Sequence, residues 1–111
     1  MKKANQTQLE MKSHQRMLLV HEQAKSECHY HATRFRNLVL SEGGLNAAKQ
    51  LLGSRHYSEG LTRLWEEGRL DISIEAAVLE EIWGSLFTPD ELETAKIRLT
   101  ELGYDMQIVR K

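Results

Sequence analysis

Apolar residues recur at helical spacing through the first third of the chain. Between Ala4 and Glu42 there is neither Gly nor Pro, and the stretch is rich in residues of high helix propensity. The positions that step by three or four residues are Met17, Val20, Ala24, Cys28, His31, Phe35 and Leu38. This pattern predicts one long helix, or two nearly collinear helices, ending at the Gly43-Gly44 pair.

Three shorter helices are predicted after this glycine pair. Leucines and alanines mark the first of them, and Ser58 is the expected N-cap of the second. The third has its expected N-cap at Asp71 or Ser73. Their expected extents are 45–52, 58–67 and 71–83.

The last predicted helix has the clearest start in the chain. Thr88, Pro89 and Glu91 form a capping box with proline at the first helical position, and Gly103 is the expected end of the helix. Together these patterns predict an all-α fold, a small bundle of five or six helices with a long N-terminal helix.

The start of the chain is polar enough to project from this bundle. We therefore expect an N-terminal helical extension over residues 1–27 and a compact helical domain over residues 28–111. An apolar cluster on a projecting helix can be buried in a two-fold homodimer, through Met17, Val20 and Ala24. In the alternative interpretation the same residues fold back onto the chain's own helices.

Composition excludes several classes of protein. The 111 residues are 41% hydrophobic and 28% charged with a formal net charge of -1, which argues against a disordered chain and a uniformly basic nucleic-acid coat. The single Cys28 cannot form an internal disulfide. Because apolar runs are too short for a membrane span or a signal peptide, we expect a soluble, cytoplasmic protein without membrane contact.

Charge is unevenly distributed along the chain. The span Glu66–Glu93 carries nine acids and one base, Arg69, whereas the first 42 residues are net basic. Such an acidic belt can bind a basic protein partner, although charged helix surfaces also serve simply to keep a bundle soluble. The candidate partner-binding residues are Glu66, Glu67, Glu80 and Glu81.

Residues 28–104 resemble a family of small helical bacterial and phage proteins, often encoded near restriction, modification or mobile-element genes. The matching motifs include Gly43-Gly44-Leu45, Ala47-Ala48-Lys49, Leu51-Leu52, the run from Glu59 to Asp71, Ser73-Ile74-Glu75-Ala76, Val78-Leu79-Glu80, Leu86-Phe87-Thr88, Arg98-Leu99 and Leu102-Gly103-Tyr104. The resemblance implies a short helical protein. It brings no activity, ligand or functional residue with it.

Metal binding and nucleophilic catalysis both require several suitable side chains at one point, and the spacing of His and Cys in this sequence does not provide them. Of the residues in the His/Cys cluster, only Cys28 and His31 have a spacing that could share an ion, and two further ligands would be needed. We expect His14, His21 and His29 to be solvated. No catalytic motif accompanies them, so we expect no metal, no cofactor and no enzymatic activity.

A nucleic-acid interface is the alternative functional hypothesis. The candidate contact residues are Arg34, Arg36, Arg55 and Arg63, and residues 45–67 have the size of a helix-turn-helix. However, Glu59, Glu66 and Glu67 lie on the helix that would enter the major groove, where they would repel phosphates.

The leading hypothesis is a non-enzymatic protein-interaction module. It would be a small helical accessory or inhibitor protein that binds a partner through the acidic belt, with phage or host defence as its context. Trp65 and Trp83 both fall in apolar helical patterns and are expected in the core.

Overall fold

The computed structural model describes residues 2–55 and 57–104, with side chains described from Thr7 onward. Within these ranges the chain forms six α-helices and two 3₁₀ helices, and no β-strand. The helices are α1 (Lys2–Cys28), α2 (Thr33–Glu42), α3 (Gly44–Gly53), α4 (Glu59–Glu66), η1 (Leu70–Ile72), α5 (Ile74–Val78), η2 (Glu81–Leu86) and α6 (Pro89–Glu101). The prediction of an all-α fold with a long N-terminal helix is confirmed.

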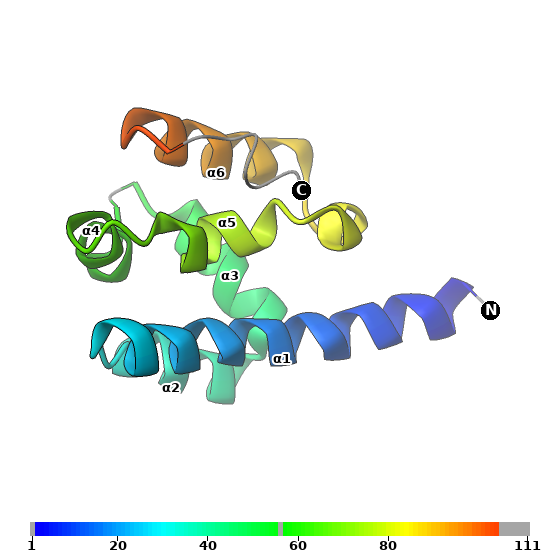
Figure 1. Cartoon of the computed structure of the whole chain (residues 1–111). Coiled ribbons are helices and arrows are strands. Elements are labelled where there is room, and N and C mark those ends of the chain that lie inside the picture. Colours follow the sequence, from blue (N-terminus) through cyan, green and yellow to red (C-terminus); the bar gives the residue numbers. More distant parts are fainter. Residues whose placement is uncertain (1, 56, 105–111) are drawn as a thin grey trace.

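The central helix of the arrangement is α3. It crosses away from the layer formed by α1 and α2 and reaches α6 on the opposite side of the molecule, with α5 packed between (Figure 1). The helix α1 extends beyond the others at its N-terminal end, and its length of about 40 Å nearly equals the 43 Å longest dimension. None of the described helices is both long and apolar enough to cross a membrane.

The predicted collinear helix is interrupted by a sharp turn. The first helix ends at Cys28, and His29 takes a positive φ of 55°, which reverses the chain so that α2 packs beside α1. Histidine is one of the few side chains enriched in this conformation. The amide of Tyr30 donates a 3.0 Å hydrogen bond to the carbonyl of Ala24 and closes the turn. As a result His31, expected on the apolar face, is exposed.

Three N-caps are found at expected positions, with Ser73 rather than Asp71 capping α5. The side chains of Ser58, Ser73 and Thr88 accept hydrogen bonds from backbone amides in the first turns of α4, α5 and α6. The Glu91 side chain completes the capping box at Thr88, and Pro89 occupies the first helical position. These contacts satisfy amides that a helix leaves without intrahelical partners.

The prediction of a continuous helix as far as Trp83 is wrong in its second half. The observed helix, α5, ends at Val78, and Glu80 adopts an extended conformation before η2 begins. The Glu80 carboxylate accepts hydrogen bonds from Arg16 at 2.7 Å and from the indole nitrogen of Trp83 at 2.9 Å. This bridge joins α1 to η2 at the point where the predicted helix is broken. Trp83 is buried, as predicted.

The second half of α1 is part of the core of the chain itself. Met17 and Val20 lie in the main apolar cluster, and Ala24 packs in a second cluster with Cys28 and Leu64. With exposures of 0%, 4% and 2%, Met17, Val20 and Ala24 cannot contact a second copy. The predicted dimer face is therefore wrong, because these residues fold back onto α3 and its neighbours. The homodimer itself stays a prediction.

A buried ion pair joins the ends of three helices. The Arg98 guanidinium on α6 donates to the carbonyls of Leu51 at 3.1 Å and Ser54 at 2.5 Å, and so caps the C-terminus of α3. It also contacts the Glu75 carboxylate at 3.4 Å. Burial raises the pKa of Glu75, although the neighbouring guanidinium opposes this shift. The Arg98–Glu75 pair therefore connects α6 to α3 and α5.

Candidate protein-binding groove

An open groove of about 680 Å³ runs between α6 and the segment formed by α5 and η2. Its lining combines an apolar floor with a charged rim. The apolar residues are Val78, Leu79, Leu92 and Ile97. The charged residues are Glu80, Glu81, Glu93, Lys96 and Glu101.

One edge of α6 supplies half of this groove. The lining residues fall in the pairs 92/93, 96/97 and 100/101, and a spacing of four places them along one side of a helix. The opposite edge is anchored in the core by Ala95 and Leu99, both with 0% exposure. Ile97 is consequently left 47% exposed beside the groove.

The groove carries an excess of negative charge. Its four acids face a single base, Lys96. Burial alone would raise the pKa of Glu80, but hydrogen bonds from Arg16 and Trp83 outweigh it and lower the pKa below its usual value. Glu80 is thus ionised and already paired with Arg16, whereas Glu81 and Glu93 are exposed acids. The negative charge that the rim offers to a partner therefore comes from Glu81 and Glu93 rather than from Glu80.

The predicted acidic belt does not form one surface. Glu80 and Glu81 line the groove, whereas Glu66 and Glu67 lie at the C-terminal end of α4, on the other side of the molecule from η2 (Figure 1). Glu67 is also paired with Arg63, at 3.3 Å. Other acids of the belt are bound within the chain: Asp71 by Arg69, Glu75 by Arg98 and Glu91 by Lys49.

The structure brings together two of the four predicted nucleic-acid contacts. Arg34 and Arg63 both lie near Tyr30, with the Arg63 guanidinium 5.6 Å from the centre of the tyrosine ring. Arg36 lies near His21, and Arg55 is exposed in the connection between α3 and α4. The nucleic-acid hypothesis stays a prediction.

The predicted His/Cys cluster is dispersed. Cys28 is buried whereas His31 is exposed, and the described residues contain no group of three His, Cys, Asp or Glu that could hold a metal ion. His21 was expected to be solvated, but it is buried against neighbouring helices, where desolvation lowers its pKa. His14 is half-buried because its ring contacts α3.

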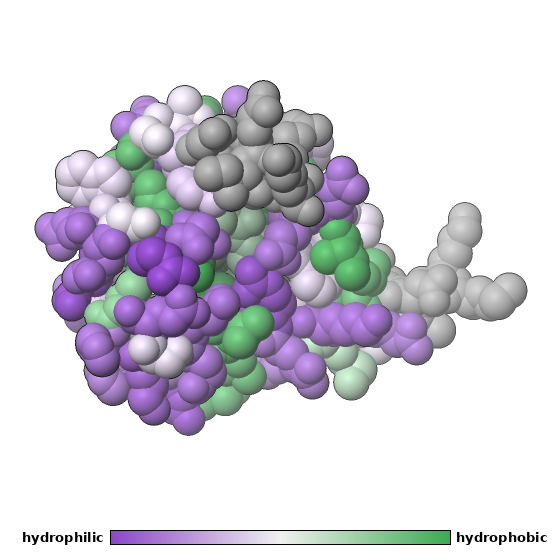
Figure 2. All heavy atoms as spheres, in the orientation of Figure 1, coloured by the Kyte–Doolittle hydropathy of each residue, from purple (hydrophilic) through white to green (hydrophobic). Residues whose placement is uncertain are grey.

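Two exposed apolar residues were not anticipated from the sequence. Trp65, expected in the core, is 49% exposed on α4, because Leu61 and Leu64 supply the buried face of that short helix. Ile82 is 53% exposed, and Figure 2 shows hydrophobic atoms at the surface where η2 lies. Ile97 lies outside the apolar face that the sequence pattern assigns to its helix, so the pattern is consistent with its exposure. The exposure of Ile82 does not follow from the pattern, which does not predict the 3₁₀ helix η2.

No family model, no curated protein and no solved structure matches this chain. The resemblance of residues 28–104 to small bacterial and phage proteins therefore stays a prediction.

Proposed function

We propose that this protein is a non-enzymatic interaction module that binds a basic amphipathic helix of a partner protein in the groove beside α6. The observation that carries the proposal is the pairing of an apolar floor with a rim of four acids and one base. Amphipathic helices dock in apolar grooves of other proteins by inserting side chains spaced three or four residues apart.

The two kinds of lining residue would make different contributions. Leu79, Leu92 and Ile97 would bury apolar side chains of the partner, which supplies most of the affinity. Glu81 and Glu93 would attract Lys or Arg side chains at the rim, which speeds association and selects against acidic partners. Glu80 would mainly keep η2 in place through Arg16 and Trp83.

A pair of synthetic peptides tests the proposal without knowledge of the natural partner. One peptide is an amphipathic helix of Leu and Lys, and the other has the same pattern of Leu and Glu. We expect saturable binding of the Leu/Lys helix, measured by fluorescence anisotropy, and weaker binding as salt is raised. Binding of both peptides with equal affinity would contradict the proposal.

A charge-reversal variant locates the binding site. Glu81→Lys combined with Glu93→Lys should lower the affinity for the Leu/Lys helix by about tenfold or more. The matched control is Glu66→Lys combined with Glu67→Lys, which makes the same charge change on α4, away from the groove. If the control weakens binding as much as the groove variant, the site is not the groove.

A further inference from the structure

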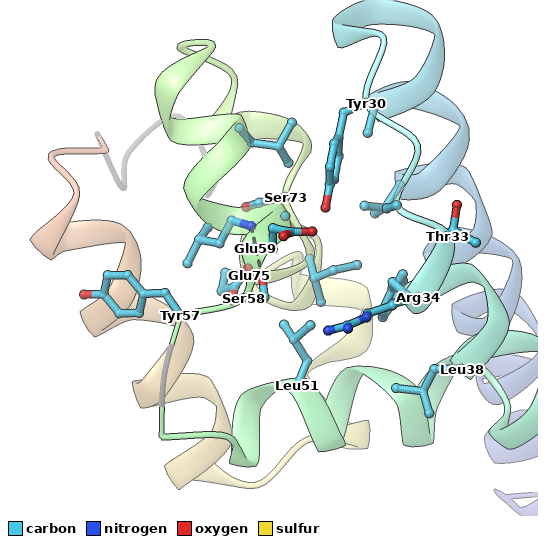
Figure 3. Close-up of a pocket in the computed structure, with 18 of the residues that line it drawn as sticks. Tyr30, Thr33, Arg34, Leu38, Leu51, Tyr57, Ser58, Glu59, Ser73 and Glu75 are labelled. Carbon is cyan, nitrogen blue, oxygen red and sulfur yellow. Dashed lines mark hydrogen bonds between the residues drawn. The ribbon is translucent and has the colours of Figure 1, made fainter.

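A second cavity, of about 490 Å³, lies on another side of the molecule from the acidic groove. Its walls come from the end of α1, the turn before α2, α2 itself, α3, α4 and the start of α5 (Figure 3). Cavities that hold small molecules typically measure about 300–1,000 Å³. The space is therefore large enough for a small organic ligand.

The floor of this cavity is apolar. Its largest aliphatic side chains and its one phenylalanine are Phe35, Leu38, Leu51, Leu61, Leu64 and Ile74. A ligand that reaches this floor must present a hydrocarbon or aromatic group to it, because a polar group there would lose its hydrogen bonds to water.

Two opposite charges project into the cavity from facing walls. Figure 3 shows the Arg34 guanidinium pointing in from α2, and the Glu59 carboxylate from the first residue of α4. They form no ion pair with each other, and within the described residues Arg34 has no carboxylate partner. Arg34 is thus available to a ligand, whereas Glu59 is hydrogen-bonded to the Tyr30 hydroxyl.

Tyr30 places a third polar group at the same point. Its hydroxyl points into the cavity toward Glu59, and the ring is held by the Arg63 guanidinium at 5.6 Å from its centre. Burial and the Glu59 carboxylate raise the pKa of this hydroxyl, so it stays protonated at neutral pH. The second acid of the cavity, Glu75, is buried and engaged by Arg98.

We propose that this cavity binds an apolar α-amino acid as its zwitterion. The ligand carboxylate would pair with Arg34, for which a planar guanidinium offers two parallel hydrogen bonds. The ligand ammonium would pair with Glu59 and donate to the Tyr30 hydroxyl oxygen, and the apolar side chain would occupy the floor. A ligand with a single charge would leave one of these two walls without an opposite charge, and so would bind more weakly.

Titration with amino acids and their blocked derivatives tests this ligand class. L-leucine and L-phenylalanine should produce saturable chemical-shift changes in the amides of Tyr30, Arg34 and Glu59. N-acetyl-L-leucine lacks the ammonium group and L-leucinamide lacks the carboxylate. Each should bind with an affinity at least about tenfold lower than that of L-leucine. Equal binding of the blocked derivatives, or no saturable change with either amino acid at about 10 mM, would overturn the proposal.

Two matched pairs of variants locate the site. Arg34→Gln and Glu59→Gln should each weaken leucine binding by about tenfold. Arg36→Gln and Glu66→Gln remove charges that are also exposed, from the same two helices but outside the cavity, and they should leave binding unchanged. Thermal unfolding of all four variants confirms that they are folded. Equal losses in the control variants would place the ligand elsewhere and refute the proposed site.

Discussion

The backbone nitrogen of Gly44 lies 2.9 Å from Nδ1 of the His14 ring and donates a hydrogen bond to it. The contact joins the first residue of α3 to the middle of α1, and it caps a helix that has no side-chain cap of its own. A Cβ atom on Gly44 would lie only 2.4 Å from the Cα atom of His14. The absence of a side chain is therefore what lets the central helix approach α1.

Replacing this glycine should destabilise the protein. Gly44→Ala should lower the free energy of unfolding by about 1–3 kcal/mol or more, because the new methyl group meets backbone atoms that cannot turn away. The measurement is urea unfolding followed by circular dichroism. Gly53→Ala, at the other end of α3 with nothing within 4 Å of its Cβ position, is the control and should have little effect. Equal losses in both variants would contradict the close-approach explanation.

The ion pair of Glu80 with Arg16 should support the position of η2. Glu80→Gln should cost about 1 kcal/mol, since the pair is partly exposed and screened by solvent. Because the folded pKa of Glu80 is lowered, its contribution is complete above the ordinary pKa near 4.5 and is lost as the pH falls. The fluorescence of Trp83, its hydrogen-bonded neighbour, reports the change, although Trp65 also contributes to the signal. Glu81→Gln is the control, and a similar loss there would argue against the specific pair.

Burial of His21 should make the stability of the protein sensitive to mild acid. Its folded pKa is lowered from 6.5, chiefly by desolvation and also by nearby Arg36 and His31, against an opposing effect of Glu22. The stability is therefore complete above pH 6.5 and falls as the pH drops toward the folded pKa, because the unfolded chain binds the proton more readily. Unfolding in urea at a series of pH values should show this slope.

Two variants identify the histidine responsible for that slope. His21→Leu should flatten the dependence of stability on pH between about pH 5.5 and about pH 7, around the ordinary histidine pKa of about 6.5. His29→Asn is the control, because asparagine also tolerates the positive φ of the turn. A slope that survives in His21→Leu would assign the effect to another group.

Removal of Arg98 should be the most damaging of these substitutions. Arg98→Leu leaves the Glu75 carboxylate buried without its partner and uncaps the carbonyls at the end of α3, which should cost about 3–5 kcal/mol. The double variant Arg98→Leu/Glu75→Leu removes the stranded charge and should recover part of that loss. Thermal and urea unfolding measure both. A double variant less stable than Arg98→Leu would contradict this account.

The ends of helices are where local sequence predicted the structure best. Ser58, Ser73 and Thr88 each cap the helix that follows, because a cap depends on a side chain and on amides two or three positions later. The turn at His29 could not be predicted in the same way. No Gly or Pro marks it, and its conformation depends on α2 packing beside α1.

Candidate binding sites were less predictable because their residues are distant in the chain. The acidic belt contains Glu80, Glu81 and Glu93, but its spacing does not show that Glu93 lines one groove with the other two, nor that Ile97 of α6 joins them there. The sequence predicts Arg34 as a nucleic-acid contact, whereas the structure places it opposite Glu59 across a cavity. A count of charges along a sequence does not show which of them share a face.

The sequence by itself determined the helical class of this protein and the capped starts of α4 and α6, because these follow from local spacing and capping. Only the tertiary structure decided what Met17, Val20 and Ala24 pack against, and which acids are already paired. An apolar face of a helix can be buried equally well against a second copy or against the chain's own helices. The choice depends on whether the chain can fold back, which the turn at His29 and the approach of Gly44 to His14 make possible.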